Sequence, residues 1–329
     1  MEIKYEKNNQ NKSSREEKNP IFASYIYNYQ SFKGYNPDKV NLGDYIQSLA
    51  AQQYFPKNEK FVDRDALSSE QSNEEIKIIG NGWYYLSDDR HIPANNMDIL
   101  LTAFHINNTD CGDEFPGVIN YLKNYSKSRP IGCRDFGTVD FLNERHIDCY
   151  FSSCLTTTIR RRDFVSSEER IGIVFSDFDL EKLSHPKLFP IKKSFIQRKA
   201  ASKITNIIKR YPGEKISFVT HACSLSIPHA ERFELAKELL RTYAKAKLVI
   251  TSRIHAALPC LAMGTPVILV CSYDERRFKG LSDLLNHIWV DCSGKDEVNT
   301  DSSGNIVNKN DFQKYANELR KQCVEFASV

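Results

Sequence analysis

An arginine and a histidine lie two residues apart inside the long apolar stretch 248–268. This stretch begins with a predicted strand that ends at Thr251, and Ser252 is expected to cap the helix that follows. Arg253 and His255 therefore fall at the mouth of a strand–helix turn. A charged group within an apolar run is either paired or functional. The two side chains together predict an anion site that contains a general acid or base; the alternative is a core histidine whose hydrogen bonds are satisfied.

Three further residues stand where predicted strands end. Arg134 follows the apolar run 130–133 and precedes Asp135, a good helix N-cap. A guanidinium at this junction suits a carboxylate or phosphate, which it can hold through two parallel hydrogen bonds. A surface arginine paired with an acid would have the same sequence pattern. His221 directly follows a predicted strand, and His105 comes late in another one, so both are candidates for the same edge of a sheet.

A glycine turn near the N-terminus opens a predicted helix. Asp44 is expected to cap this helix, and Gln47 completes a capping-box pattern three residues later. Gly43 permits a close backbone approach, and a helix N-terminus favours an anion or a hydroxyl-rich ligand. Asn41 and these neighbours are therefore candidate ligand-binding residues. The alternative is an ordinary loop and cap.

A second glycine turn, 80–83, directly follows the predicted strand 76–79. Ligands of doubly wound folds bind outside the carboxyl ends of the strands. Asn81 lies there, and Trp83 is suited to stack on a sugar ring. A turn with Trp83 in the core is the alternative.

Alternating strands and helices position these residues. Apolar runs predict strands at 76–79, 99–106, 130–133, 149–151, 170–175, 216–220, 248–251 and 266–270, and helical spacing predicts helices at 195–210 and 229–246. This order predicts parallel sheets with helices on both faces. The pattern breaks between 155 and 169. We therefore predict two α/β domains, residues 20–160 and 161–329, facing a cleft, after a flexible tail over residues 1–19.

Composition excludes several functional classes. The chain has 329 residues, with 45 Lys plus Arg against 42 Asp plus Glu. This balance is too even for a nucleic-acid binder. No apolar run reaches the roughly 20 residues of a membrane-spanning helix. The nine cysteines are odd in number and include no Cys-x-x-Cys pair. They predict reduced thiols in a cytoplasmic protein rather than disulfides or a zinc site, and no secretory signal is visible at the N-terminus.

Five blocks in this order resemble the polysaccharide pyruvyl transferase family. They are Asn41–Gln47, Gly80–Trp83, Pro130–Asp135, Arg232–Ala236 and Ile250–Ile268. The resemblance implies a fold similar to GT-B glycosyltransferases, with two Rossmann-like domains. It implies phosphoenolpyruvate as donor, a sugar of a cell-surface glycan as acceptor, and a cyclic pyruvate ketal, commonly 4,6-linked, as product. Arg134, Arg253 and His255 match positions that bind the donor or act in catalysis in relatives. The histidine nearer the N-terminus is either His91 or His105, and we prefer His105 because it ends a predicted strand.

The residues suit this chemistry. Phosphoenolpyruvate carries a carboxylate and a phosphate, so two arginines are a sensible minimum for charge matching. We expect Arg134 and Arg253 to clamp the donor, helped by Ser252 and Ile254, with the C-terminal domain as the phosphoenolpyruvate side. His255 is the expected general acid or base. His221 would assist it or hold phosphate, and His105 is a further catalytic candidate.

The remaining expectations concern the acceptor and the partners. Asn41, Gly43, Asp44, Asn81 and Trp83 are expected to bind the acceptor in the N-terminal domain. The scheme requires no cofactor and no metal. The acceptor is a hexose-containing glycan or a lipid-linked oligosaccharide. A lipid-linked acceptor would bring the protein to the inner face of the membrane without a membrane segment of its own.

Two other functions fit the same architecture, because a fold does not fix a function. A GT-B glycosyltransferase would use a nucleotide sugar and bind its diphosphate with Arg253 and His255. A glycan-binding protein would use Trp83 and the tyrosines as a sugar platform without consuming a donor. The three functions differ in their donor, which is phosphoenolpyruvate, a nucleotide sugar or none.

Overall fold

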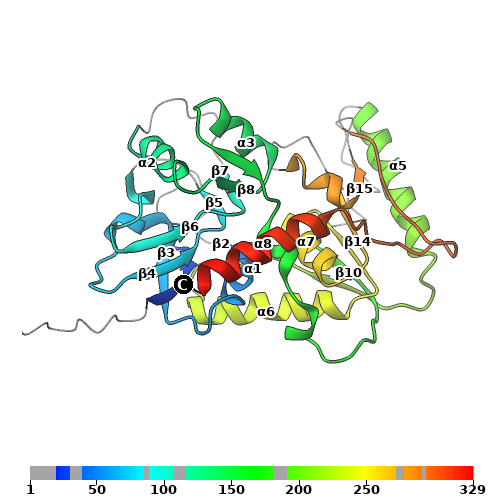
Figure 1. The fold of residues 1–329 in the computed structure, drawn as a ribbon. Helices are drawn as coiled ribbons and strands as arrows, with labels where there is room; N and C mark the ends of the chain where they lie inside the picture. The colour runs from blue at the N-terminus through cyan, green and yellow to red at the C-terminus, as the bar shows by residue number, and fades with distance from the viewer. Residues whose placement is uncertain are drawn as a thin grey trace, which may run out of the picture.

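The computed structural model describes residues 20–29, 39–84, 89–106, 116–178, 180, 191–271, 278–290 and 294–328. The predicted tail over residues 1–19 lies outside this part of the chain. Within it, the protein is a mixed α/β structure in which parallel sheets and helices form two halves side by side (Figure 1).

The N-terminal half contains two parallel four-stranded sheets. The first has the order β3-β1-β4-β6, from β3 (Lys60–Asp63), β1 (Ile21–Ile26), β4 (Ile76–Ile79) and β6 (Met97–Leu100). The second has the order β5-β7-β8-β9, from β5 (Gly82–Tyr84), β7 (Phe104–Ile106), β8 (Ile131–Cys133) and β9 (Cys149–Phe151). The backbone nitrogen of Gly80, just after β4, donates to Leu100 of β6, and that of Gly82 in β5 donates to Ala103 just before β7, so the β4–β6 pairing continues into the β5–β7 pairing. The N-terminal half is therefore one parallel layer with an interruption across its middle.

This interruption corrects the prediction of a single strand over 99–106. The strand divides into β6 and β7 because Ala103 adopts a left-handed backbone with φ of 50°. A non-glycine residue in this region breaks the regular extended conformation. The strand predicted over 76–79 is confirmed and stops where the Gly80–Gly82 turn begins.

In the described part of this half, the α-helices are α1 (Leu42–Gln52), α2 (Pro116–Ser126) and α3 (Phe136–Asn143). The hydroxyl of Ser48 in α1 donates to the carbonyl of Tyr25 in β1 at 2.8 Å, which fixes α1 against the sheet. Asp135 caps α3 as predicted, because its Oδ1 accepts from the backbone nitrogen of Thr138.

The C-terminal half contains one parallel five-stranded sheet in the order β11-β10-β13-β14-β15. Its strands are β10 (Ile173–Ser176), β11 (Ile216–Val219), β13 (Leu248–Thr251), β14 (Val267–Cys271) and β15 (Asn286–Trp289). Its helices are α5 (Ile191–Ile208), α6 (His229–Lys245) and α7 (Ile254–Ala262). One apolar cluster lies between this sheet and α5, whereas α6 and α7 pack into a cluster on the other side. The predicted helices and strands of this half are confirmed to within a few residues.

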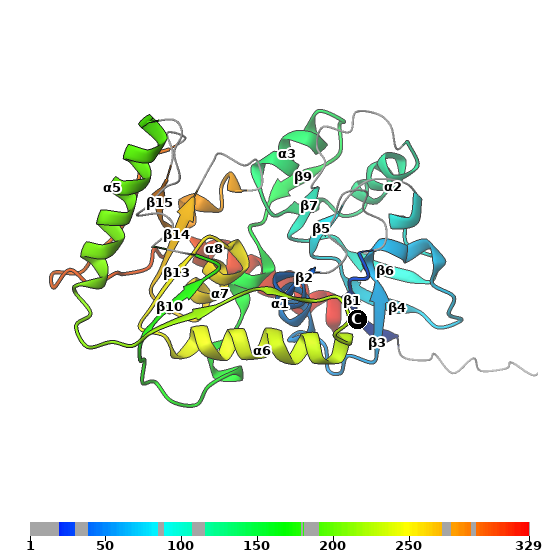
Figure 2. The same ribbon diagram turned by 180° about the vertical axis from the view of Figure 1, so that it is seen from behind.

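The two halves share a core and are joined further by a short strand pair and by the last helix. The larger apolar cluster includes buried residues of both halves. The short strand β2 (Lys39–Asn41) pairs antiparallel with β12 (Ala222–Ser224), which joins the start of α1 to the C-terminal half. The final helix α8 (Phe312–Ala327) crosses between the halves and ends beside β4 (Figures 1 and 2), where Lys77 donates to the carbonyl of Phe326. The domain boundary near residue 160 stays a prediction.

Seven cysteines lie in the described part of the chain, and each is a free thiol. Among the described residues, no helix combines the length and the apolar character needed to cross a membrane.

Candidate functional site

The turn between β13 and α7 places Arg253 and His255 at the N-terminus of a buried helix. Arg253 is the N-cap residue of α7, and its backbone nitrogen donates to Oγ1 of Thr251 at 2.9 Å. Ser252, which we expected to cap the helix, is not the cap; its hydroxyl instead donates to the carbonyl of Asp177. His255 is buried in the first turn, and Ile254 packs into the shared core.

Asp177 holds Arg253 at this turn, a role that the sequence reasoning missed. It directly follows β10, and its Oδ2 lies 3.0 Å from Nε of Arg253. The same carboxylate accepts from the hydroxyl of Thr220 and the backbone nitrogen of His221. Burial would raise the pKa of Asp177, but these donors and Arg253 hold it below its usual value. Arg253 itself is half exposed, and its described ion pair uses Nε. The sequence feature that could have indicated this role of Asp177 is a polar residue directly after an apolar strand.

His221 turns its side chain into the core. Its Nε2 lies 2.7 Å from the hydroxyl of Tyr243, which also contacts the hydroxyl of Ser176 at 2.8 Å. Burial lowers the pKa of His221 to about 4, with Asp177 opposing and Arg253 assisting this shift. The imidazole is therefore neutral near pH 7. Its backbone carbonyl accepts from the nitrogen of Leu42, which ties this segment to the start of α1.

The N-terminus of α1 lies directly against His255. A Cβ placed on Gly43 would lie 3.0 Å from Nδ1 and 3.1 Å from Cβ of His255, so glycine permits this close approach. Asn41 is the N-cap, and its side chain accepts from the nitrogen of Gly43 at 3.1 Å. The prediction that Asp44 caps the helix is therefore wrong. Pairing of β2 with β12 starts the helix at Leu42, which leaves Asp44 within the first turn.

Asp44 is fully buried and organises Trp83. Its Oδ1 accepts from Nε1 of Trp83 at 2.9 Å, and its Oδ2 accepts from the hydroxyl of Tyr29 at 2.6 Å. Burial raises the pKa of Asp44, and Arg64 opposes the shift. The guanidinium of Arg64 lies 4.2 Å from the centroid of the half-buried Trp83 ring. Asn81 is also buried, and its amide donates to the carbonyl of Gln47 in α1.

A second cluster forms where β7 and β8 end. Nδ1 of His105 lies 2.6 Å from Oδ2 of Asp135, and Nε of Arg134 lies 3.6 Å from the same oxygen. Burial would raise the pKa of Asp135, but His105 and Arg134 lower it below its usual value. Arg134 is buried, and within the described residues its Nε makes no hydrogen bond. A buried guanidinium whose ion pair is this long is suited to receive a further anion.

The two candidate N-terminal histidines lie in different surroundings. Trp83 stands opposite His105 in the pairing of β5 with β7, so His105 lies between the Trp83 and Arg134 segments. His91 instead lies 3.5 Å from Asp65, the buried ion-pair partner of Arg64.

These contacts connect most of the predicted residues into one region. Gly43 adjoins His255, Asp44 bonds Trp83, β5 pairs with β7, and Asp135 joins His105 to Arg134. The side chains of His221 and Ile254 point into the core instead.

Strained backbone accompanies this edge of the sheets. Ala103, Ser153 and Asp177 have φ values of 50°, 65° and 48°, and each lies one to three residues beyond the end of a parallel strand. Such conformations cost free energy and persist where the surroundings enforce them, often at functional sites.

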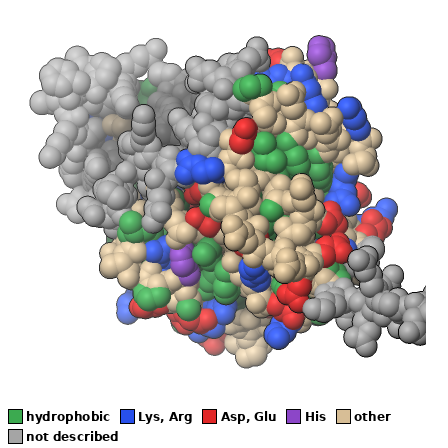
Figure 3. Space-filling view, turned by 90° about the vertical axis from the view of Figure 1, so that its left-hand side faces the viewer, with side chains coloured by type: hydrophobic (Ala, Val, Ile, Leu, Met, Phe, Trp, Pro, Cys, Tyr) green, Lys and Arg blue, Asp and Glu red, His purple; other side chains and the backbone are tan. Residues whose placement is uncertain are grey.

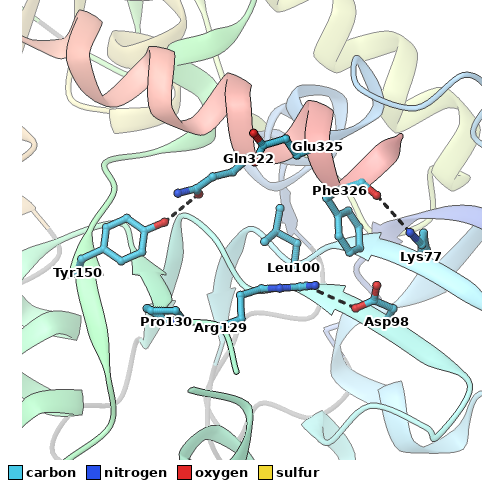
Figure 4. A pocket seen from close by; sticks show the side chains of 9 residues that line it. All are labelled: Lys77, Asp98, Leu100, Arg129, Pro130, Tyr150, Gln322, Glu325 and Phe326. Carbon is cyan, nitrogen blue, oxygen red and sulfur yellow. Dashed lines mark hydrogen bonds and ion pairs between the residues drawn. The ribbon is translucent and has the colours of Figure 1, made fainter. Parts of the chain in front are cut away.

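One well-defined cavity lies elsewhere. It has a volume of about 440 Å³ and sits between the face of the N-terminal sheet and the end of α8, with Lys77, Arg129, Tyr150 and Phe326 among its lining residues (Figure 4). None of the predicted site residues lines it. Its polar groups are bonded to one another, as in the hydrogen bond from Tyr150 to Gln322. The candidate site therefore rests on side-chain contacts rather than on this cavity.

No group of three or more His, Cys, Asp or Glu side chains in the described ranges is arranged to hold a metal ion.

Comparison with known proteins bears on the chemistry. No curated protein matches the chain. The sequence model of the family described as polysaccharide pyruvyl transferase matches residues 41–275, which is more than half of the chain. This span begins at the N-cap of α1 and includes Trp83, His105, Arg134 and the Arg253–His255 turn. The chain belongs to the polysaccharide pyruvyl transferase family and is a transferase.

Proposed function

We propose that the protein transfers the enolpyruvyl group of phosphoenolpyruvate to a hexose of a bacterial-type cell-surface glycan or its lipid-linked precursor. The product is a cyclic pyruvate ketal, 4,6-linked on the hexose, and phosphate is released. The observation that carries the proposal is the buried Arg134, whose Nε makes no hydrogen bond within the described residues although Asp135 lies 3.6 Å away. An anionic donor would complete its coordination.

The donor is assigned to the two arginines. Phosphoenolpyruvate carries two anionic groups, and a guanidinium can bind each through paired hydrogen bonds. Asp177 supports this assignment because it holds Nε of Arg253 and so fixes the direction of that side chain. The N-terminus of α7 adds backbone N–H groups and a favourable dipole for an anion. We assign Ser252 to holding the Asp177 segment, through its hydrogen bond to the Asp177 carbonyl, rather than to binding the donor.

The proton transfers are assigned to His255 and His105. A proton is added to the methylene carbon of the donor, which turns it into a methyl group and makes C2 cation-like. One sugar hydroxyl attacks C2, and the second hydroxyl closes the ring as the C–O bond to phosphate breaks. Of the two hydroxyl protons, one replaces the proton given to the methyl group and the other leaves with phosphate. An imidazole can both donate and accept a proton, which suits both steps.

The remaining predicted residues receive supporting roles. His221 is neutral near pH 7 and bonded to Tyr243, so we assign it to positioning the Asp177 segment rather than to binding phosphate. We assign the half-buried Trp83 ring to contact with the acceptor, oriented by Asp44. Asn41, Gly43 and Asn81 shape the start of α1 against this ring and His255.

We also propose a cytoplasmic location and no requirement for a cofactor. The seven free thiols in the described residues support a reducing compartment. A lipid-linked acceptor would bring the enzyme to the inner membrane face.

The test is a reaction of the purified protein with phosphoenolpyruvate and a panel of hexosides, in which phosphate release and acceptor mass are both measured. Phosphate release together with a mass gain of one pyruvate ketal would establish the activity and the sugar. A rise in melting temperature with phosphoenolpyruvate alone would support the donor assignment. If a nucleotide sugar raised the melting temperature and phosphoenolpyruvate did not, the glycosyltransferase alternative would replace this proposal.

Matched variants test the assigned residues. His255→Asn should lower kcat by about 10²-fold or more, whereas the exposed His146→Asn should leave it unchanged. Arg253→Lys should raise KM for phosphoenolpyruvate, because a lysine cannot form two parallel bonds. The partly exposed Arg241→Lys on α6 is its control. Normal kinetics in His255→Asn would remove that histidine from the mechanism.

A further inference from the structure

Helix α5 and the two residues that follow it carry only positive charges. Residues 191–210 contain seven Lys and Arg residues and no Asp or Glu. The whole chain has a formal charge of only +3, so the remainder of the chain has a net charge of −4. A segment this basic within a nearly neutral protein indicates an anionic partner.

The helix buries one side and exposes a continuous stripe on the other. Ala200, Ile204 and Ile207 pack into the apolar cluster against the C-terminal sheet. The exposed stripe contains Phe195, Arg198, Lys199, Ser202, Asn206 and Lys209. Their spacing of three and four residues places them on one face of the helix.

Part of the positive charge on this helix has no acidic neighbour. Lys203 pairs with Asp296, and Arg210 donates to the carbonyl of Gly304, both beside the helix. Across the described residues, no acidic side chain forms an ion pair with Arg198, Lys199 or Lys209. The opposite end of the molecule differs, because basic and acidic side chains are interspersed over its described surface (Figure 3).

Exposed apolar side chains accompany this charge. Phe195 on the stripe is 68% exposed, and Phe218 on the edge strand β11 is 70% exposed. Phe218 stacks on Phe175, which belongs to the cluster that α5 covers, so both exposed rings lie on the same side of the sheet. Ile216 is also exposed and, two residues before Phe218, faces the same side. Cations with aromatic and aliphatic side chains are typical of surfaces that contact the interface of a lipid bilayer.

We propose that the exposed face of α5, with Phe218 and Ile216 beside it, docks on a membrane surface that contains anionic phospholipids. The cations of the stripe lie against the headgroups, and the exposed rings enter the interfacial layer. A soluble polyanion would account for the cations but not for the exposed rings. The helix lies at the outer end of the molecule, away from the N-terminal half, so a flat surface can reach it (Figures 1 and 2). The proposal does not depend on the identity of the donor or acceptor.

Vesicle sedimentation tests this surface. The full chain is mixed with vesicles of phosphatidylcholine alone or with about 30% phosphatidylglycerol, a fraction large enough to give a negative surface potential. We expect binding to the anionic vesicles and its loss at high salt, because salt screens exposed charges. The affinity of the variant Arg198→Glu/Lys199→Glu/Lys209→Glu for these vesicles should be lower by at least about tenfold.

Matched variants separate surface docking from general charge. Lys123→Glu/Lys127→Glu/Lys321→Glu changes the net charge equally, at exposed positions on α2, just after it and on α8, and should bind as the unchanged protein does. Phe195→Ser should weaken binding at low salt, because it removes an exposed ring without changing the net charge. Melting temperatures report whether each variant is folded, and turnover on a water-soluble acceptor should be unaffected by the α5 variant.

Three results would overturn the proposal. One is failure of the unchanged protein to bind anionic vesicles. Another is equal loss of binding in the α5 variant and its charge-matched control. The third is binding to a soluble polyanion such as heparin without binding to vesicles, which would replace the membrane with an anionic polymer.

Discussion

Replacing His221 with Gln should remove a large part of the acid sensitivity of the fold. Burial holds the pKa of His221 at about 4, whereas an unfolded histidine titrates near about 6.5. The unfolded chain therefore binds a proton in this window that the folded chain excludes. Stability from this group is fully present above about pH 6.5 and is lost as the pH falls through about 4.

The magnitude follows from the difference between the two pKa values. A difference of about 2.5 pH units corresponds to about 3 kcal/mol of unfolding free energy. Burial is the main cause, and the Arg253 cation adds to it. Gln at this position can still hydrogen-bond the hydroxyl of Tyr243, but it does not titrate.

The assay is urea unfolding of the two proteins at pH values from about 7 to about 4, with the difference in unfolding free energy plotted against pH. Carboxylates titrate in both proteins, so the difference isolates His221. We expect the unchanged protein to lose about 3 kcal/mol more than His221→Gln over this range. Parallel curves would refute the reasoning and show that the folded imidazole accepts a proton as readily as the unfolded one.

Three other substitutions test the site and the packing. Gly43→Ala should lower kcat about tenfold or more with little change in melting temperature, because its Cβ would displace His255; a normal kcat would contradict the close approach. Trp83→Phe should cost about 2 kcal/mol of unfolding free energy, since buried Asp44 loses a donor; an unchanged urea midpoint would count against that bond. Phe326→Ala should cost about 3 kcal/mol or more by enlarging the cavity under α8, and a loss below about 1 kcal/mol would mean that the helix end is loosely packed.

The sequence was sufficient to predict the alternation of strands and helices, but not β1, β3, α2, β15 or α8. Hydrophobic periodicity is a local property, so strands such as 248–251 and helices such as 229–246 were predicted to within a few residues. The Asp135 cap was also predicted, because it depends on residues only three apart.

Contacts between distant segments could not be predicted. Which residue caps α1 depends on the pairing of β2 with β12, about 180 residues away, so the local pattern pointed to Asp44 rather than Asn41. The break at Ala103 depends on hydrogen bonds to neighbouring strands.

The sequence identified which residues belong to the site, but only the structure showed which side chains they contact. The apolar run around 253–255 marked both charged residues, but nothing local indicated that Asp177 holds Arg253 or that Gly43 adjoins His255. His221 was placed correctly at the end of a strand, whereas the direction of its side chain depends on Tyr243 in α6.

The position of α8 has a consequence for how the protein is made. A ribosome produces the N-terminal sheet more than 150 residues before the helix that covers Lys77 and Leu100 on one of its faces. Until residues 312–327 emerge, that face lacks its cover, and a nascent chain with exposed apolar surface is prone to aggregate. The N-terminal half therefore gains its full packing only after α8 has been made, and its demand for chaperones should persist until residues 312–327 emerge.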